Sequence, residues 1–193
     1  MLSINYRLMK NLIPIFLLFL TLGCATTATT PKNSHNICKT FREKPHWPQQ
    51  SNTVFKKWGI PVYVQMAIMQ QESHFVADAR PSRGFLGFRP SSAYGYAQAL
   101  DGTWRDYLKA CKTNAERDNF ADSCDFIGWY INESHKKLGI SKLDVYNLYL
   151  AYHEGNGGYK RKSYLKKKWL LKVAKRITEK SKQYRKQLAN CQE

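Results

Sequence analysis

The stretch Met66-Ala-Ile-Met-Gln-Gln-Glu-Ser-His-Phe75 places a carboxylate in line with apolar side chains near the end of a predicted helix. Pro61 opens this helix, because proline has no backbone N–H to lose in the first turn. Val64, Ile68 and Glu72 follow one another at i, i+4 spacing and therefore share one helix face. Partial desolvation of a carboxyl favours its protonated form and raises its pKa. A general acid that works near neutral pH requires this arrangement, although a glutamate at the edge of such a face can also simply point into water.

Length and charge limit the possible classes of protein. The 193 residues suffice for one modest domain with its own core. A hydrophobic content of 43%, with many Tyr and Trp residues, argues against disorder. The formal net charge of +17 indicates an anionic partner. Nucleic acid, anionic lipid and an acidic wall polymer all meet that requirement, so charge alone does not choose among them.

The N-terminus has the pattern of an export signal. Arg7 and Lys10 precede the apolar run 12–20, which is shorter than the ~20 residues needed to span a bilayer. A basic segment followed by a short apolar segment and small residues is typical of a secretory signal. We therefore expect the chain to be exported.

The residues after the apolar run, Thr21-Leu22-Gly23-Cys24, resemble a bacterial lipobox, in which the cysteine is diacylated. The match departs from the usual pattern at Thr21, where a leucine is expected. We predict a lipoprotein signal peptide over 1–23 and lipidation of Cys24. With Ala25 next in the chain, this predicts the periplasmic face of the outer membrane. The alternative is an ordinary cleaved signal that leaves Cys24 free or paired.

Four further cysteines remain, and export would place them in an oxidising compartment. They allow three pairings. We expect Cys111–Cys124, which closes a short loop between two predicted helices, and Cys38–Cys191, which ties the chain ends together. Each bridge would contribute on the order of 2–4 kcal/mol. No pair has the C-x-x-C spacing of zinc ligands, so we expect no metal site.

The apolar pattern predicts an all-α domain. Residues 24–44 are rich in Thr, Ser, Asn and Lys and are predicted to be a flexible tether, which leaves 45–193 as the folded domain. Helical spacing of apolar residues recurs along this domain, and a long, basic, amphipathic C-terminal helix is predicted over 163–188. No stretch shows sustained alternation of the kind typical of strands.

Three short segments share the order, spacing and helical setting of a known family. They are Glu72-Ser73-x-Phe75, Gly95-Tyr96-Ala97-Gln98 and Ala151-Tyr152-His153-Glu154-Gly155. They resemble the catalytic domain of the soluble lytic transglycosylases of the lysozyme-like superfamily, whose pattern is E-S-x-F, G-x-x-Q and A-Y-N-A-G. The resemblance covers roughly residues 61–159 and implies a lysozyme-like helical domain with a substrate groove.

The resemblance also implies roles for individual residues. Glu72 matches the family's single catalytic acid/base, and Gln98 matches a glutamine that lines the sugar-binding groove. Tyr152 matches a tyrosine that contacts the catalytic carboxyl or the neighbouring N-acetyl group. Ser73 follows the acid and is expected to hold the turn there, next to substrate.

Other aromatic and polar residues are candidates from the sequence itself. Tyr94 and Tyr96 flank a loop glycine and are candidates for stacking on sugars. His153 and Glu154 replace the Asn and Ala of the family pattern, and we include both among the substrate-binding candidates. Three aromatic residues at helical spacing are expected in the core, namely Trp104, Trp129 and Tyr149.

The chemistry implied by the resemblance is cleavage of the MurNAc-β-1,4-GlcNAc bond without water, which leaves 1,6-anhydromuramoyl ends. One alternative is a hydrolytic muramidase, which needs a second carboxylate. Glu154 is the main candidate for that role, while Asp78 and Asp101 are better explained as turn or cap residues. The other alternative is a non-catalytic, basic, cell-wall-binding lipoprotein.

The expected partners follow from these features. They are peptidoglycan strands, the membrane through a lipid on Cys24, and anionic surfaces through the basic C-terminal helix. No nucleic-acid partner is expected, given the export signal and the lack of a recognition-helix motif. We expect a monomer that needs no cofactor.

Overall fold

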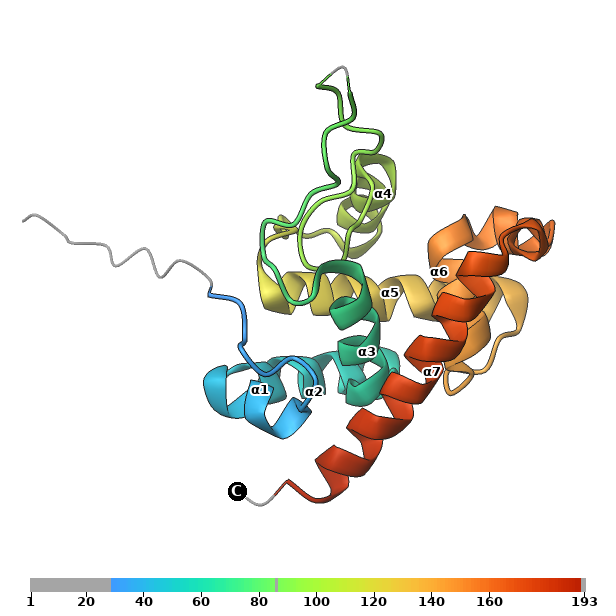
Figure 1. Cartoon of the computed structure of the whole chain (residues 1–193). Helices are drawn as coiled ribbons and strands as arrows, with labels where there is room; N and C mark the ends of the chain where they lie inside the picture. Colours follow the sequence, from blue (N-terminus) through green and yellow to red (C-terminus); the bar gives the residue numbers. More distant parts are fainter. Residues whose placement is uncertain (1–28, 86, 192–193) are drawn as a thin grey trace, which may run out of the picture.

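The computed structural model describes residues 29–85 and 87–191, and this part of the chain is helical (Figure 1). The only β pairing among these residues is an isolated bridge between Tyr94 and Ala99. The prediction of an all-α fold is therefore confirmed. The helices are α1 (Ile37–Glu43), α2 (Trp47–Trp58), α3 (Val62–Ser73), α4 (Asp101–Cys111), α5 (Phe120–Leu138), α6 (Val145–Lys160), the 3-10 helix η1 (Ser163–Lys166) and α7 (Lys168–Ala189).

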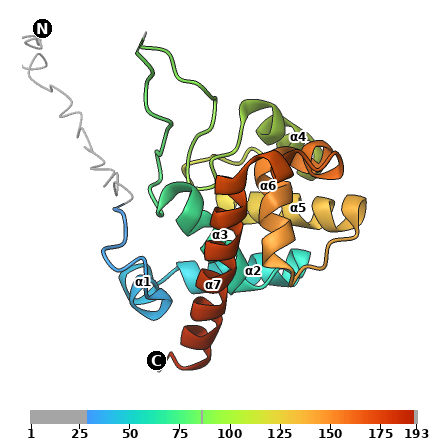
Figure 2. The ribbon, with the colours of Figure 1, turned by 45° about the vertical axis from the view of Figure 1, so that its right-hand side comes forward.

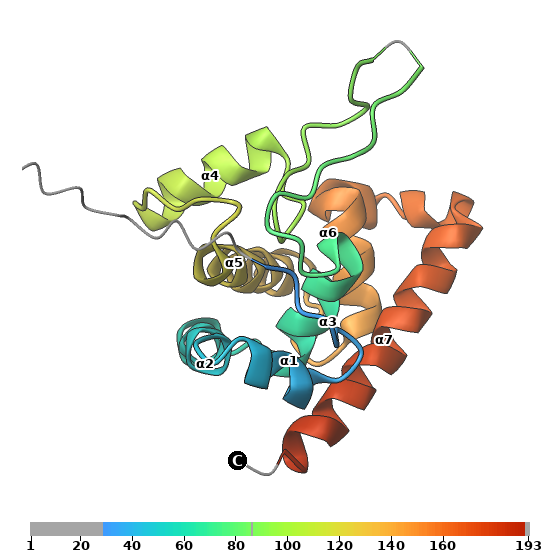
Figure 3. The same cartoon turned by 60° about the vertical axis from the view of Figure 1, so that its left-hand side comes forward.

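Helix α3 lies at the centre of the fold, with α2, α5 and α7 packed around it (Figure 3). Seven consecutive residues, 64–70, are buried, so the helix is enclosed on all sides rather than on the single face that its sequence suggests. The buried amide of Gln65 is accommodated because its Nε2 donates to the carbonyl oxygens of Ser51, at 3.1 Å, and Ile60, at 2.7 Å. The enclosing helices thereby fix the position of α3.

A partly buried carboxylate, that of Asp125, connects three of the helices. Asp125 of α5 accepts hydrogen bonds from Lys57 (2.8 Å) and Trp58 Nε1 (2.7 Å) of α2 and from the Tyr107 hydroxyl (2.8 Å) of α4. One side chain thus joins α2, α4 and α5. Helix α5 in turn packs against α3.

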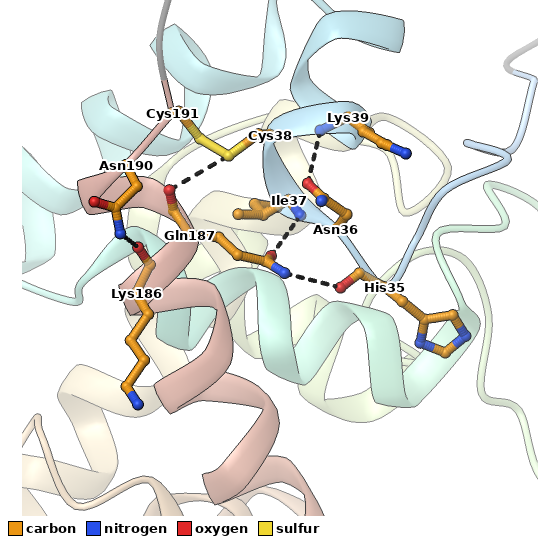
Figure 4. The surroundings of a disulfide bond; sticks show 9 residues. All are labelled: His35, Asn36, Ile37, Cys38, Lys39, Lys186, Gln187, Asn190 and Cys191. Atoms are coloured by element: carbon orange, nitrogen blue, oxygen red, sulfur yellow. Dashed lines mark hydrogen bonds between the residues drawn. A yellow bond between two sulfur atoms is a disulfide. The ribbon is translucent and has the colours of Figure 1, made fainter.

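The N-terminal helix α1 packs against the C-terminal end of α7 (Figure 4). The disulfide Cys38–Cys191 is present, as predicted. Buried Ile37 adds a second link, because its N–H donates to the side-chain oxygen of Gln187 at 2.9 Å. The prediction that 24–44 forms a flexible tether is therefore wrong for the helical residues of α1, which belong to the folded domain.

The predicted bridge between Cys111 and Cys124 is absent, and both are free thiols. Cys124 is fully buried in α5, on the side where Tyr96 lies. The side of α5 that faces α4 is instead occupied by the neighbouring Asp125, which binds Tyr107. Since adjacent residues of a helix point about 100° apart, Cys124 does not share the direction in which Asp125 meets α4.

The C-terminal helix begins later than predicted. Residues 163–166 form the short η1, and α7 then packs along α3 and α6 (Figure 2). The segment between α3 and α4 projects from the helical body in all three views (Figures 1, 2 and 3). Within the described ranges no helix combines the length and apolar character that a membrane crossing needs.

The Cys38–Cys191 bridge should contribute about 2–5 kcal/mol to the free energy of unfolding, because it restricts an unfolded chain across a sequence separation of 153 residues. Replacing both cysteines with serine should lower the free energy of unfolding by that amount in urea titrations, and reductant should have no further effect on the variant.

The matched control is Cys111→Ser, which should remain as sensitive to reductant as the wild type. Alkylation in denaturant before reduction, followed by peptide mapping, should label Cys111 and Cys124 but not Cys38 or Cys191, whereas in the folded protein buried Cys124 should be protected. Labelling that shows a Cys111–Cys124 bridge would contradict the structure.

Candidate active site

Helix α3 ends abruptly one residue after Glu72. His74 and Phe75 both have left-handed backbone conformations, with φ of 53° and 64°. The N–H of His74 donates to the Gln70 carbonyl at 3.0 Å and so closes the last turn. Such conformations cost on the order of 1–3 kcal/mol each in non-glycine residues, so surrounding contacts must impose them. Buried Phe75 provides one of these contacts, with its ring 5.5 Å from that of Trp47.

Ser73 holds this helix end. It is buried, and its hydroxyl donates to the Met69 carbonyl at 3.2 Å. It is not among the residues that line the cleft beside Glu72. Its role is therefore structural, and the substrate contact expected for it is not supported.

Glu72 opens onto a cleft of about 450 Å³ that lies between α3, α5, α6 and the segment before α4. Of the predicted site residues, the cleft brings together Glu72, Gln98, Tyr152, His153 and Glu154. The remaining lining residues are Ser91, Ala93, Ala99, Leu100, Thr103, Phe126, Tyr130 and Gly155.

The Glu72 carboxyl is held in an environment that disfavours its charge. Among the described residues, its Oε1 is sealed from solvent and has no hydrogen-bond partner. Burial raises the pKa of Glu72 to about 7, an effect partly offset by the nearby Tyr149 hydroxyl, which acts as a hydrogen-bond donor. The partial negative charge at the end of α3 acts in the same direction as burial. The carboxyl can therefore carry a proton near neutral pH and deliver it to a bound group.

Tyr149 is a site residue that the sequence analysis assigned only to the core. It is indeed buried, but its hydroxyl lies against Glu72. Burial, together with the Glu72 carboxylate, holds the pKa of Tyr149 well above its usual range, so the phenol stays neutral and can donate. The available signal was its position three residues before Tyr152 on α6, which puts both tyrosines on one helix face.

Tyr152 connects α6 to the segment that carries Gln98. Its hydroxyl donates to the Ala97 carbonyl at 2.6 Å. Its ring packs at nearly right angles against those of Tyr130, at 5.2 Å, and Phe126, at 6.4 Å. Tyr152 therefore shapes the cleft opposite Gln98 and fixes the width between α6 and the loop.

The G-x-x-Q spacing has a local physical cause. Gly95 has φ of 79°, and a Cβ at this position would lie 2.0 Å from the Arg117 carbonyl oxygen, so only glycine fits. The side-chain Nε2 of Gln98 donates to the carbonyls of Gly95 and Ala79, both at 2.9 Å. Because the amide N–H groups hold the loop, Oε1 is the group that Gln98 can offer to a ligand.

Glu154 is buried in a network that uses both of its oxygens. Its side chain is 3% exposed, and Oε1 accepts from Lys167 Nζ at 2.6 Å and lies 3.0 Å from His153 Nδ1. Oε2 accepts from the Ser163 hydroxyl. Burial alone would raise the pKa of Glu154, but the hydrogen bonds from Lys167, Ser163 and His153 prevail and lower it to about 2. Glu154 thus joins α6, η1 and α7 as a permanent carboxylate.

Residues 12–191 match the protein family described as "Transglycosylase SLT domain". The chain belongs to this family. The matched region contains all three motifs and begins within the predicted signal peptide. Comparisons with curated proteins and with solved structures find no match. Membership implies peptidoglycan lytic transglycosylase activity, with peptidoglycan as the substrate.

Two aromatic residues predicted to bind substrate in this SLT domain lie elsewhere. Tyr96 is 2% exposed and packs edge-on against Trp47, with ring centres 5.9 Å apart, so it belongs to the core. Tyr94 has one ring face covered by the Arg80 guanidinium at 4.0 Å, and its hydroxyl donates to Asp118 at 2.8 Å. Neither tyrosine lines the cleft.

The remaining acidic candidates are also outside the cleft. Asp101 is the first residue of α4 and forms an ion pair with Arg117 at 2.8 Å. Asp78 is exposed and does not line the cleft. In the part of the chain that the structure describes, no group of three or more His, Cys, Asp or Glu side chains is arranged to hold a metal ion.

Glu72 and Glu154 should affect stability with opposite dependence on pH. Between the ordinary value of 4.5 and about 7, the folded state binds more protons at Glu72 than the unfolded state does. The free energy of unfolding therefore falls as pH rises through this window. A shift of one pKa unit corresponds to about 1.4 kcal/mol. In urea titrations, the free energy of unfolding of the wild type should therefore fall by roughly 1–3 kcal/mol more than that of Glu72→Gln between pH 5 and pH 8.

The matched comparison is Glu154→Gln. Because the pKa of Glu154 is lowered from 4.5 to about 2, its stabilisation is present above about pH 4.5 and is lost as pH falls towards 2. Glu154→Gln should therefore be less stable than the wild type at pH 7. Equal pH dependence of wild type and Glu72→Gln between pH 5 and pH 8 would refute the buried state of Glu72.

Proposed function

We propose that the protein cleaves the MurNAc-β-1,4-GlcNAc bond of peptidoglycan without consuming water and leaves a 1,6-anhydromuramoyl end. The proposal rests on one observation: the two carboxyl groups that line the cleft differ in their hydrogen bonding. Glu72 has an unpartnered oxygen and a pKa of about 7, whereas both oxygens of Glu154 are engaged. The cleft therefore offers one carboxyl for chemistry.

The first step requires a proton donor. Protonated Glu72 transfers its proton to the glycosidic oxygen, and the bond from that oxygen to C1 of the muramoyl residue breaks. Positive charge that develops at C1 is compensated by the carbonyl oxygen of the substrate's own 2-N-acetyl group, which bonds to C1. The neutral phenol of Tyr149 lies against Glu72 and stabilises the carboxylate that remains.

The second step requires a base. The Glu72 carboxylate removes the proton from the muramoyl C6 hydroxyl, whose oxygen attacks C1 and releases the N-acetyl oxygen. The 1,6-anhydro ring is then complete, and Glu72 is protonated again. One carboxyl serves both steps, because the pKa of Glu72 lies near neutral pH and neither protonation state is strongly disfavoured there.

The surroundings of Glu154 argue against a hydrolytic muramidase. A hydrolase needs a second carboxylate that positions water or attacks C1. The carboxylate of Glu154 is 97% covered and already accepts from Lys167 and Ser163. A purely wall-binding role would leave unexplained why a desolvated carboxyl, which costs stability, opens onto the cleft.

We also propose that the protein acts from a membrane anchor. Residues 1–23 and Cys24 lie outside the described residues, so the signal peptide, the lipidation and the periplasmic face of the outer membrane remain predictions. A lipid on Cys24 would leave a short connection before α1, which starts at Ile37. The domain would then stay within reach of the peptidoglycan layer.

Digestion of purified sacculi tests the proposal. The wild type should release muropeptides that are lighter by one water than hydrolytic products, and oxygen-18 from the solvent should not appear in the new ends. Glu72→Gln should lower the rate by about 10²–10⁴, the usual contribution of a general acid/base.

The control is Glu179→Gln, which removes an exposed carboxylate on α7 and should digest sacculi at the wild-type rate. Incorporation of oxygen-18 would show a hydrolase. Release of anhydro ends by Glu72→Gln at the wild-type rate would remove Glu72 from the mechanism.

A further inference from the structure

Trp169 is a large aromatic residue that the fold leaves open to solvent beside the cleft. It is 55% exposed, although it directly precedes Leu170, the first residue of the buried stripe of α7. Burial of an apolar side chain of this size would stabilise the fold, and this position lacks that contribution. A single exposed aromatic residue is not unusual by itself, so the contacts of Trp169 decide what it does.

The Trp169 ring contacts a residue of the cleft wall. Its centre lies 5.1 Å from that of His153, and the two rings are nearly perpendicular, at 78°. His153 lines the cleft, and its ring is also 6.4 Å from that of Tyr149, which lies against Glu72. A line of aromatic rings therefore runs from the catalytic carboxyl past the cleft wall to Trp169.

The buried Glu154 network fixes this line in place. Glu154 holds the His153 ring through Nδ1, which leaves Nε2 as the free ring nitrogen. It also binds Lys167, the residue that caps the start of α7 two positions before Trp169. One carboxylate of α6 thus sets the orientation of His153 and the start of α7, the helix that carries Trp169. Figure 1 shows that α6 and α7 follow one another closely at this end of the fold.

We propose that Trp169 and His153 form a sugar-binding platform that continues the cleft, with Glu154 as its positioning residue. The ligand is an N-acetylhexosamine ring of the glycan strand. Pyranose rings present C–H groups on their faces, which pack on an indole, while their hydroxyl and N-acetyl groups hydrogen-bond to a ring nitrogen such as His153 Nε2. This inference rests on the proposed function and adds a subsite to it.

Binding in the absence of turnover tests the platform. Peptide-free glycan strands are titrated by calorimetry into protein that carries Glu72→Gln as the parent substitution. Adding Trp169→Ala should weaken binding roughly 10-fold, as expected for loss of an aromatic anchor, and Trp169→Phe should retain most of the affinity. The matched control is Phe55→Ala, which removes an exposed aromatic on α2 and should bind as the parent does. Equal affinity of the Trp169→Ala variant and the parent would overturn the proposal.

The positioning role of Glu154 has its own measurement. Adding Glu154→Gln to the parent should also weaken strand binding. When Glu154→Gln and Trp169→Ala are combined, the fold-loss in affinity should be smaller than the product of the two separate fold-losses, because both substitutions act through one platform. Independent, multiplicative effects would remove Glu154 from the platform.

The two proposals can fail separately. If the wild type binds strands through Trp169 but releases no anhydro ends from sacculi, the platform stands and the proposed reaction fails. If anhydro ends appear but Trp169→Ala binds as the parent does, only the platform fails.

Discussion

The candidate active site depends on a carboxyl, that of Glu72, whose Oε1 is buried without a compensating charge. Glu72 sits in the last turn of a helix that is enclosed on all sides, and its Oε1 has no partner among the described residues. This burial costs stability at neutral pH and makes Glu72 a proton donor in the same pH range. The cost is tolerated because the enclosing helices α2, α5 and α7 fix α3, so that Glu72 stays at the cleft wall.

Specific contacts fix the positions of the elements around Glu72. The left-handed turn at His74 and Phe75 ends α3 immediately after the acid. Tyr152 holds α6 to the loop that carries Gln98, and this sets the distance across the cleft. Glu154 holds α6 to η1 and to the start of α7, because it accepts hydrogen bonds from Ser163 and Lys167. A second carboxylate is therefore present in the cleft wall, but it acts as a structural link.

The sequence predicted the parts of the site that belong to the three motifs and missed those that depend on packing alone. Gly95 and Gln98 were predicted through their resemblance to the family's G-x-x-Q pattern, whereas the contact with the Arg117 carbonyl that requires the glycine is a tertiary one and cannot be seen in the sequence. The prediction of a Cys111–Cys124 bridge was wrong because closeness in the sequence does not determine the direction in which a side chain points from its helix. Tyr149 was assigned to the core because an apolar stripe does not show that its hydroxyl meets a carboxyl in another helix. The short α1 has no periodic pattern and is stabilised by its contacts with α7.

The proposed reaction depends on the protonation state of Glu72, which a direct titration measures. The carboxyl carbon of Glu72 can be followed by NMR in protein labelled with ¹³C at glutamate carboxyl groups, and the resonance can be assigned by its loss in Glu72→Gln. The titration midpoint of this resonance should lie at about pH 7. A midpoint near the ordinary value of 4.5 would contradict the proposed reaction, because Glu72 would then be ionised at neutral pH and unable to donate the first proton.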